Sequence, residues 1–571
     1  MIRLTELKLP LSALPIEHRR AADAPPETDA DRIPHPHPLE ALTKLAAETL
    51  GITTHQINSL QVFKRSFDAR KADLLAVYIV DIDLDTALEQ QLLEQFHKHP
   101  HISATPDMLY PLKAAKQPPA IRPVVVGFGP CGMFAALLLA QMGLKPIVIE
   151  RGKTVRQRTK DTWGLWRKNI LQPESNVQFG EGGAGTFSDG KLYSQIKDPR
   201  HLGRKVMQEF VNAGAPAEIL YEAHPHIGTF KLVKVVENIR EQIIALGGEV
   251  RFEQRVIDLD IAINAQGQRQ LRGLQVLDAA SGNSYTLRAD HAVMALGHSS
   301  RDTFTMLHDR GVAMQAKPFS VGFRIEHPQG VIDRARWGRH AGHPLLGAAD
   351  YKLVHHANNG RAVYSFCMCP GGTVVAATSE PGRVVTNGMS QYSRNERNAN
   401  AGIVVGIEPS DYPTDVDAPA LAGIALQRQL ESAAYIAGGS NYEAPGQLVG
   451  DFIAGNASTS FGSVIPSYKP GVHLGSLDNS LPTFAIEAIR EALPVFGRKI
   501  KGFDMHDAVL TGVETRTSSP IKIPRGEDYQ STNTMGLYPA GEGASYAGGI
   551  LSAGVDGIKV AEALARSLHL G

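Results

Sequence analysis

The sequence predicts an α/β protein in which a Rossmann-like dinucleotide-binding domain carries an inserted β-rich α+β domain and follows an N-terminal ferredoxin-like α+β domain. Three observations predict this class: a glycine fingerprint between two apolar runs, a β-α-β-β-α-β pattern near the N-terminus, and short β runs separated by Gly and Pro from about residue 317. The expected domains are residues 1–115, residues 119–316 and 505–571 as two parts of the dinucleotide domain, and residues 317–504 as the β-rich domain.

The first 115 residues alternate strand and helix signals. Strands are expected at 2–10, 60–64, 74–84 and near 107–112, and helices at 39–50 and 86–98, with a long loop at 22–38. Residues 64–71 include four cations, which suit either a solvated hairpin tip or a contact with phosphate, RNA or a partner. Residues 113–123 are expected to form a linker.

The glycine fingerprint follows the buried strand expected at residues 124–126. Gly127, Gly129 and Gly132 have the G-x-G-x-x-G spacing. The first glycine permits a tight turn, the second lets the backbone approach a pyrophosphate, and the third lets helix and strand pack closely. Pro130 begins the expected helix, 130–142, whose free N–H groups would point at the pyrophosphate.

A second expected strand, residues 145–150, ends in Glu150, 18 residues after Gly132. A βαβ unit places there the acid that accepts hydrogen bonds from a ribose diol. An acid at this position argues against a 2′-phosphate, so the sequence predicts FAD or NAD rather than NADP. Arg151 is included in the expected binding site. The alternative is a glycine-rich turn in another kind of α/β protein.

A second glycine-rich stretch, residues 180–191, repeats the same spacing without the strand and helix that a nucleotide site needs. We expect a loop that packs its backbone against a flat ring or a diphosphate through Gly183 and Thr186, with a simple turn as the alternative. Lys191 ends this stretch and is a candidate catalytic residue.

Patterns typical of a dinucleotide-binding domain occur in two later parts of the chain. Helices are expected at 201–213 and 229–246, a strand at 249–252 and a β-meander at 255–287; a buried strand at 290–298 then carries Ala295 and Gly297. Beyond the β-rich part, whose one clear helix is expected near 419–437, a strand at 537–540 leads through Gly541 and Glu542 to a helix at 550–568. Gly549 and Ile550 start that helix and complete the expected site.

Composition excludes several classes of protein. Lys plus Arg and Asp plus Glu both number 58, so no global field attracts nucleic acid or an anionic membrane. Three cysteines cannot form a disulfide framework and no signal peptide is recognisable, which predicts a cytoplasmic protein. The most apolar window, 124–143, contains the fingerprint glycines and is not expected to span a membrane. No metal site is predicted.

Four motifs support a family resemblance: SNVQFGEGGAGTFSDGK at 175–191, FCMCPGG at 366–372, NGMS at 387–390 and ETRTSSP at 514–520. With the two glycine-rich ends, they make the chain resemble the glutathione-reductase-like flavoproteins with a two-part FAD domain, and more closely a group of bacterial FAD-dependent dehydrogenases, over nearly its whole length. The resemblance implies FAD, with the C-terminal element on the ribityl chain and the β-rich domain over the ring. By resemblance, Val256 offers its backbone to adenine, and Glu542 replaces the more usual Asp.

The expected function is a two-electron oxidoreductase in which flavin N5 exchanges hydride with a small-molecule substrate. No His or Cys has a flavinylation signature, so FAD is expected to bind non-covalently. Residues expected to face the ring are Lys191, Arg324, His327, Glu514 and Arg516, although Glu514 and Arg516 could instead pair with one another. The alternatives are a flavin-dependent RNA-modifying or RNA-binding protein, which the neutral net charge disfavours, and a non-enzymatic flavin redox sensor.

Cys367 and Cys369 are candidate catalytic residues, with Arg516 and Lys191 as the others. On a regular strand both sulfurs would emerge on one face, near a strand end at Pro370. There they would relay electrons or attack a substrate; the alternative is that both are small buried hydrophobes. No second nucleotide-binding unit is recognisable, so either NAD(P)H binds transiently or a redox partner protein exchanges electrons with the flavin.

Overall fold

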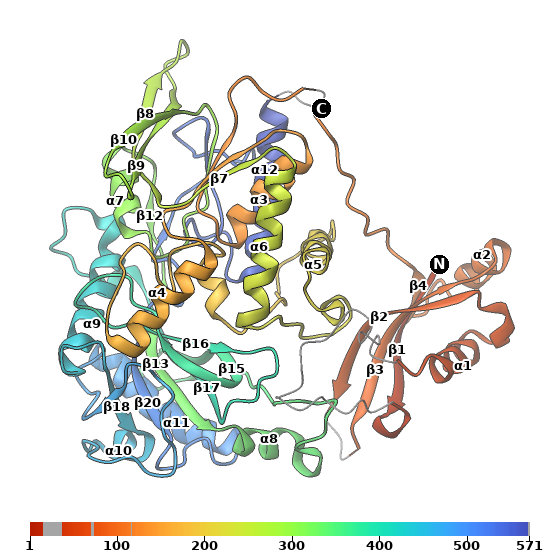
Figure 1. Ribbon diagram of the computed structural model, residues 1–571. Helices are drawn as coiled ribbons and strands as arrows, with labels where there is room; N and C mark the ends of the chain where they lie inside the picture. Colours follow the sequence, from red (N-terminus) through yellow and green to blue (C-terminus); the bar gives the residue numbers. More distant parts are fainter. Residues whose placement is uncertain (15–36, 70–72, 116, 569–571) are drawn as a thin grey trace.

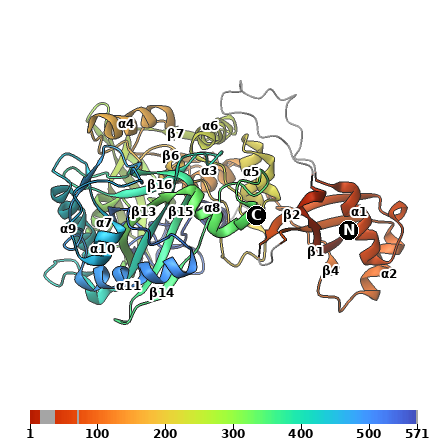
Figure 2. The ribbon, with the colours of Figure 1, turned by 90° about the horizontal axis from the view of Figure 1, so that it is seen from below.

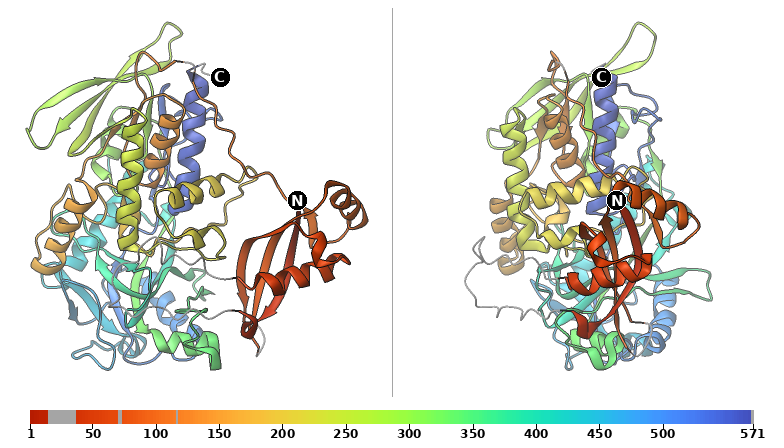
Figure 3. Two further views of the ribbon diagram at one scale, coloured as in Figure 1. Left: turned by 45° about the vertical axis from the view of Figure 1, so that its right-hand side comes forward. Right: turned by 90° about the vertical axis from the view of Figure 1, so that its right-hand side faces the viewer.

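The computed structural model describes residues 1–14, 37–69, 73–115 and 117–568. A small N-terminal domain stands beside a larger body, and the body combines a parallel-sheet domain with an inserted domain built on an antiparallel sheet (Figure 1). Figure 2 shows the same separation from below. The extended residues 105–115 lead from the N-terminal domain toward the parallel-sheet domain (Figure 3).

The N-terminal domain has the expected β-α-β-β-α-β order. Its elements are β1 (Ile2–Pro10), α1 (Leu39–Leu50), β2 (Ser59–Asp68), β3 (Leu75–Asp83), α2 (Thr86–Gln95) and β4 (Ile102–Ala104), and the antiparallel sheet has the order β2-β3-β1-β4. The last strand is not at 107–112 as expected, because Pro106 just before this stretch and Pro111 within it lack the N–H donors that a strand ladder needs. Most of the loop expected at 22–38 lies outside the described residues.

Arg65, within the basic stretch at 64–71, connects the N-terminal domain to the body. Its side chain is buried and forms an ion pair with Glu222. Its backbone N–H donates to Tyr221 O at 2.7 Å, and the Ala223 N–H donates to Arg65 O at 2.9 Å. The expectation of a solvated hairpin tip is therefore wrong for Arg65. Residues 70–72 of this stretch lie outside the described residues.

The parallel sheet has the strand order β22-β11-β5-β6-β7. Its strands are β5 (Val124–Val126), β6 (Ile147–Ile149), β7 (Glu249–Arg251), β11 (Ala292–Met294) and β22 (Leu537–Pro539), all paired in parallel. Side chains alternate between the two faces: Val125 packs with the helices, whereas Val124 and Val126 pack on the opposite face. Continuous apolar strands suit this sheet because both of its faces are covered.

Four helices cover one face of the parallel sheet: α3 (Pro130–Gln141), α5 (Leu202–Asn212), α6 (Thr229–Ala245) and α12 (Ile550–Ser567). Helices α3 and α12 lie side by side (Figure 1). The opposite face carries α7 (Arg301–Asp309) and the meander β8 (Gln254–Ile263), β9 (Arg269–Asp278) and β10 (Ser284–Arg288). The four helices and the meander lie where their sequence patterns predict them.

The inserted domain is built on an eight-stranded sheet. The strands are β13 (Phe319–Pro328), β14 (Val354–His356), β15 (Ala362–Ala376), β16 (Thr386–Ser390), β17 (Asn398–Ile407), β18 (Ala444–Leu448), β19 (Val472–Leu474) and β20 (Val509–Glu514). A two-stranded ribbon, β12 (Gln315–Ala316) with β21 (Ile521–Lys522), lies at its junction with the parallel-sheet domain. Because β20 belongs to the eight-stranded sheet, the chain returns to the parallel-sheet domain later than the expected boundary at residue 505.

Several helices were not expected from the sequence: α4 (Val155–Lys168), α7, α8 (Gln329–Trp337), α10 (Val449–Ala454) and α11 (Thr483–Lys499), whereas α9 (Ala422–Ala437) matches its prediction. The buried face of α4 contains Arg158 and Thr162, so its apolar period is hidden. Helix α11 contains Pro494, a residue that normally argues against a helix interior. No helix within the described part of the chain is long and apolar enough to cross a membrane.

We predict that the N-terminal domain folds independently of the body. It has its own apolar core, and Arg65 and Tyr110 supply polar contacts to the body, the latter through Glu562 at 2.8 Å. A truncated chain beginning at Pro119 should therefore stay soluble, with a melting temperature within a few degrees of that of the full chain. Differential scanning fluorimetry of both chains checks this. An insoluble truncated chain would show that the two parts share one core.

Candidate functional site

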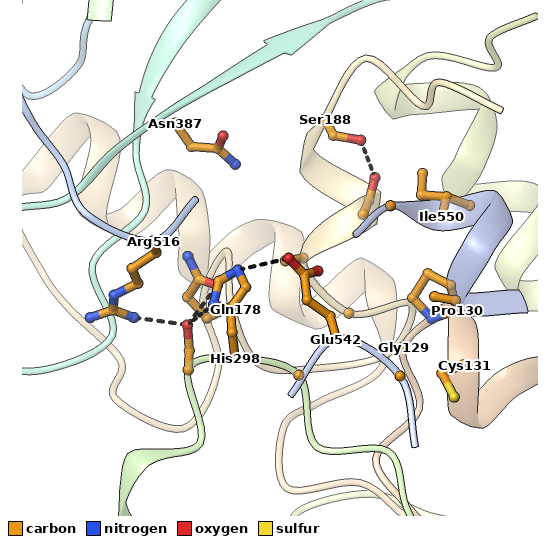
Figure 4. Close-up of a pocket in the computed structure, with 18 of the residues that line it drawn as sticks. Gly129, Pro130, Cys131, Gln178, Ser188, His298, Asn387, Arg516, Glu542 and Ile550 are labelled. Carbon is orange, nitrogen blue, oxygen red and sulfur yellow. Dashed lines mark hydrogen bonds and ion pairs between the residues drawn. The ribbon is translucent and has the colours of Figure 1, made fainter. Parts of the chain in front are cut away.

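A cavity of about 480 Å³ lies where the carboxyl ends of four parallel strands meet the inserted sheet. Residues that follow β5, β6, β11 and β22 form one wall, and residues of β15, β16 and β20 form the other. The carboxyl edge of a parallel sheet is where ligands bind in open α/β folds. In Figure 4, Pro130 and Ile550 lie on one side of Glu542, and Gln178, His298 and Arg516 lie on the other.

The glycine fingerprint forms a tightly packed corner of the cavity. Gly127 has φ +96°, and a Cβ there would lie 2.2 Å from Ala295 O. A Cβ on Gly132 would lie 1.9 Å from Gly127 O, which confirms that this glycine is needed for helix–strand packing. Among the described residues, no side chain caps the N-terminus of α3 at Gly129, so its first N–H groups are available to an anion.

The second glycine-rich stretch packs directly against the fingerprint. Gly183 has φ +63°, and a Cβ on it would lie 2.7 Å from Gly129 Cα. Both glycines line the cavity, together with Gly180 and Gly185. Two loops that are far apart in sequence therefore present bare backbone to one space, which suits a flat or phosphate-bearing ligand.

Glu150 is buried at the end of β6 and lines the cavity. Its Oε2 accepts the Phe128 N–H at 2.9 Å, and its Oε1 accepts the N–H groups of Gly152 and Gly180 at 2.8 and 3.0 Å. A carboxylate has about four acceptor positions, so capacity for a ligand hydroxyl remains. Glu150 thus joins both glycine-rich loops, a structural role that its sequence position does not indicate.

Arg158, on α4, binds the second glycine-rich loop, a role that the sequence analysis did not predict. Its guanidinium is fully buried and donates to the carbonyl oxygens of Asn176 and Val177, both at 2.7 Å, and of Glu181 at 2.8 Å. Burial lowers the pKa of Arg158 to about 10, opposed by the nearby Glu150 and Glu181 carboxylates. No local motif marks such a residue, because its partners are carbonyl groups and any sequence supplies those.

Most residues expected at the site line the cavity. These are Gly127, Gly129, Pro130, Glu150, Arg151, Gly183, Lys191, Val256, Ala295, Gly297, Cys367, Glu514, Arg516, Gly541, Glu542, Gly549 and Ile550. Gly132, Thr186 and Cys369 do not line it. The short 3₁₀ turn Ala184–Phe187 buries the Thr186 side chain, whose hydroxyl lies against Gly182.

Arg516 borders the cavity but is held entirely by other residues of the protein. Its Nε and Nη2 bind Glu431 at 3.1 Å each, and its Nη1 donates to Ser299 and Ser379 at 3.0 and 2.7 Å. Arg301 binds the same Glu431 carboxylate at 2.7 and 2.9 Å. Burial alone would raise the pKa of Glu431, but the two guanidinium groups hold it well below its usual range.

The alternative that Arg516 pairs with Glu514 is therefore wrong. Glu514 instead pairs with Arg324, whose Nε and Nη2 donate to it at 2.9 and 3.0 Å. Neither Arg324 nor His327 faces the cavity as expected; both are fully buried. His327 Nε2 lies 2.6 Å from Phe503 O, and burial lowers the His327 pKa to about 4. The sequence of β13 could not show which of its side chains face the cavity, because both faces of this strand are buried.

Glu542 and His298 point toward one another across the cavity wall (Figure 4). His298 Nε2 lies 4.0 Å from Glu542 Oε1, and His298 Nδ1 lies 3.0 Å from Ser299 Oγ. Since the Ser299 hydroxyl donates to Gln178 Oε1, His298 donates from Nδ1 and turns a bare Nε2 toward Glu542. Burial raises the pKa of Glu542 to about 7 and lowers that of His298 to about 3. The pair can hold one proton near neutral pH.

The loop that carries Glu542 is fixed by a residue that sequence analysis missed. Asp556, on α12, accepts the Gly541 N–H at 2.8 Å through Oδ2 and pairs with Arg525 through both oxygens at 2.5 and 3.0 Å. The sequence does carry a signal for Asp556: it is an acidic residue inside a helix whose neighbouring residues are small and apolar.

Cys367 and Cys369 do not follow the regular strand alternation that was expected. Phe366 pairs with Gly402 and Cys369 with Asn400, so Cys367 and Met368 together lie opposite the single residue Ala401. This bulge, with Cys367 at φ +44°, leaves Cys367 at the cavity wall and Cys369 fully buried. Lys191 Nζ donates to Met368 O beside them.

Comparison with known proteins places the chain in a family. An uncharacterized protein of Clostridium beijerinckii is 46% identical over 533 residues, which cover 93% of this chain and 97% of that protein. The chain belongs to the same family as this protein. Residues 318–517 match the family model described as FAD-dependent protein, C-terminal domain-like, and residues 1–83 match a domain of unknown function (DUF8436).

Two solved structures illustrate more distant likenesses. The glycerol-3-phosphate dehydrogenase from Bacillus halodurans, solved with FAD, is 11% identical, with a TM-score of 0.34 over 80% of this chain and 66% of that one. A flavoprotein/dehydrogenase from Cytophaga hutchinsonii is 12% identical, with a TM-score of 0.35 over 79% of each chain. At these values the likenesses carry no argument about this protein, and the glutathione-reductase-like grouping stays a prediction.

We predict that Glu431→Gln strongly destabilises the protein. The change leaves the buried Arg516 guanidinium without a paired carboxylate and Arg301 with Glu380 alone, so the free energy of unfolding should fall by about 3–5 kcal/mol. Urea unfolding followed by tryptophan fluorescence measures this. Glu249→Gln, the same change in a half-exposed ion pair with Arg122 and Arg251, should cost about 0–1 kcal/mol. Equal effects of both changes would contradict the anchoring role.

A second prediction concerns pH. The Glu542 pKa is raised from its usual 4.5 to about 7, so folding favours the protonated form, and stability is lost as pH rises through that window. Glu542→Gln removes this loss. Without added ligand, the stability of the variant relative to wild type should increase by on the order of 1–3 kcal/mol between pH 5 and pH 8. His298 contributes equally to the pH dependence of both proteins, so its effect cancels in the comparison. A difference in stability that does not change with pH, measured by chemical denaturation, would overturn the prediction.

Proposed function

We propose that this protein is an FAD-dependent oxidoreductase that binds FAD non-covalently in the cavity and acts on a small-molecule substrate. The observation that carries the proposal is the pair of interlocked glycine loops at Gly129 and Gly183, joined by the Glu150 carboxylate at the carboxyl edge of a parallel sheet. The family model matched by residues 318–517, described as belonging to an FAD-dependent protein, supports it.

The residues present fit such a cofactor. The N-terminus of α3 and the bare backbone at Gly129 and Gly183 suit the pyrophosphate, and the remaining acceptor capacity of Glu150 suits a ribose diol. Around Gly548 and Gly549, at the start of α12, an added Cβ would meet no described atom within 4 Å, so the backbone is open to the cavity. Glu542 lies between the side of the cavity that carries Pro130 and Ile550 and the side that carries His298, and it would bind the ribityl hydroxyl groups (Figure 4).

Bound FAD would supply two-electron chemistry, exchanging hydride at flavin N5. The chain itself supplies orientation and charge. Arg516 acts as a positioning residue, because its hydrogen bonds to Ser299 and Glu431 hold the wall beside His298. Glu542 can take up or release a proton near neutral pH, and His298 Nε2 is the acceptor that faces it. Electrons would arrive from NAD(P)H bound transiently or from a redox partner protein.

The cofactor proposal predicts that the protein purifies yellow and that acid precipitation releases FAD into the supernatant. Flavin that stays with the precipitate would contradict non-covalent binding, and a colourless protein that FAD does not restore would contradict the proposal as a whole. Anaerobic photoreduction of the flavin, followed by a screen of small-molecule and protein acceptors, identifies the reaction partners.

Glu150→Gln is predicted to weaken FAD binding. The amide replaces an anionic acceptor with a neutral one and turns an NH₂ group toward the backbone donors of Phe128 or Gly152, so FAD affinity should fall by about 1.5–3 kcal/mol. Titration of the FAD-free protein, followed by flavin fluorescence, measures the dissociation constant. Glu249→Gln, on the neighbouring strand β7 and away from the cavity, is the matched control and should leave it unchanged.

A further inference from the structure

The bulge in β15 gives Cys367 an environment that the proposed binding of FAD does not require. Cys367 has φ +44°, a conformation that is costly for a residue with a side chain and persists only when its surroundings enforce it. Two cations hold the bulge: Arg324 Nη1 donates to Cys367 O at 2.8 Å, and Lys191 Nζ donates to Met368 O. Bulges next to binding sites commonly redirect one side chain, and here that side chain is the Cys367 thiol.

The second cysteine lies directly behind the first. Cys369 is fully buried, and its thiol donates to the backbone carbonyl oxygen of Cys367 at 3.4 Å. Gly388 makes room for it, because a Cβ on Gly388 would lie 3.0 Å from Cys369 Sγ. A thiol so close to Cys367 can turn its S–H group to the Cys367 sulfur once that sulfur is ionised, and such a hydrogen bond favours the ionised form.

The charges around Cys367 come from five segments of the chain. The ionisable groups that influence it are Lys191, Arg324 and Cys369, which favour the thiolate, and Asp189, Glu514 and Glu542, which oppose it. The Cys369 hydrogen bond lowers the pKa of the Cys367 thiol most, and together with the two cations it holds this pKa well below its usual range despite burial.

We propose that Cys367 is a nucleophilic thiolate that forms a covalent bond with a soft electrophile entering the cavity, and that Cys369 is its positioning residue. The Cys367 sulfur provides the electron pair of the new S–C bond. In a carbonyl-conjugated alkene, the π pair moves to the neighbouring carbon, which takes a proton from water. The thiolate is a property of the chain alone, whereas its use on a substrate that also reacts with the flavin rests on the proposed function.

The test is the pH dependence of alkylation by iodoacetamide, in which iodide leaves as the S–C bond forms. Peptide mapping by mass spectrometry separates the three cysteines. Cys131 is an internal control because it lines the same cavity, yet burial raises its pKa well above the usual range. At pH 6.5 an ordinary thiol of pKa about 8.5 is about 1% ionised. Cys367 should therefore react at least about tenfold faster than Cys131 at this pH.

Two variants test the role of Cys369. Cys369→Ser keeps a hydrogen-bond donor and should preserve fast alkylation at pH 6.5, whereas Cys369→Ala removes the donor and should slow Cys367 about tenfold or more. Melting temperatures of both variants show whether the fold is intact. A Cys367 rate that rises only through pH 8–9 in the wild type, or that is equal in the two Cys369 variants, overturns the proposal. FAD binding is measured in a separate experiment, so failure of the FAD proposal and failure of the Cys367 thiolate proposal can be told apart.

Discussion

The cavity depends on buried guanidinium–carboxylate pairs that join distant parts of the chain. Glu431 on α9 binds Arg301, at the start of α7 in the parallel-sheet domain, and Arg516, just after β20. Arg324 on β13 binds Glu514 in the same way. Removing such charges from water costs several kcal/mol per ion, so the arrangement holds only when the guanidinium and carboxylate groups meet in one geometry. That requirement fixes the inserted sheet against the carboxyl edge of the parallel strands.

A second set of polar contacts shapes the loops that the sheets leave free. Glu150 accepts N–H groups from both glycine-rich loops, Arg158 donates to the carbonyl groups of the second, and Asp556 holds the loop before α12. Each is a buried charged group whose partners are wholly or partly backbone. The cavity is therefore preorganised, and a ligand that enters it does not have to order the loops, a cost that otherwise reduces affinity.

Local sequence patterns located the parallel strands and the helices that cover them, and their failures elsewhere have physical causes. Apolar period and caps located the strands around Gly127 and the helix that starts at Pro130, because these features depend on a few neighbouring residues. Helix α4 was missed because Arg158 occupies a core position, and the last N-terminal strand was misplaced beyond Pro106. The alternation rule also failed at Cys367, since a bulge inserts one residue without any local signal.

By itself the sequence determined the chemistry of the glycine-rich wall of the cavity, since a glycine fingerprint and its terminal acid work through spacing along one short βαβ segment. Only the tertiary structure decided the partners of Arg516 and Glu514, the separate environments of Cys367 and Cys369, and the burial of Arg65 against Glu222. The reason is the distance along the chain over which these interactions act. Turn, cap and strand preferences act over a few residues, whereas a buried ion pair or a redirected thiol depends on groups that the chain brings together from more than a hundred residues away.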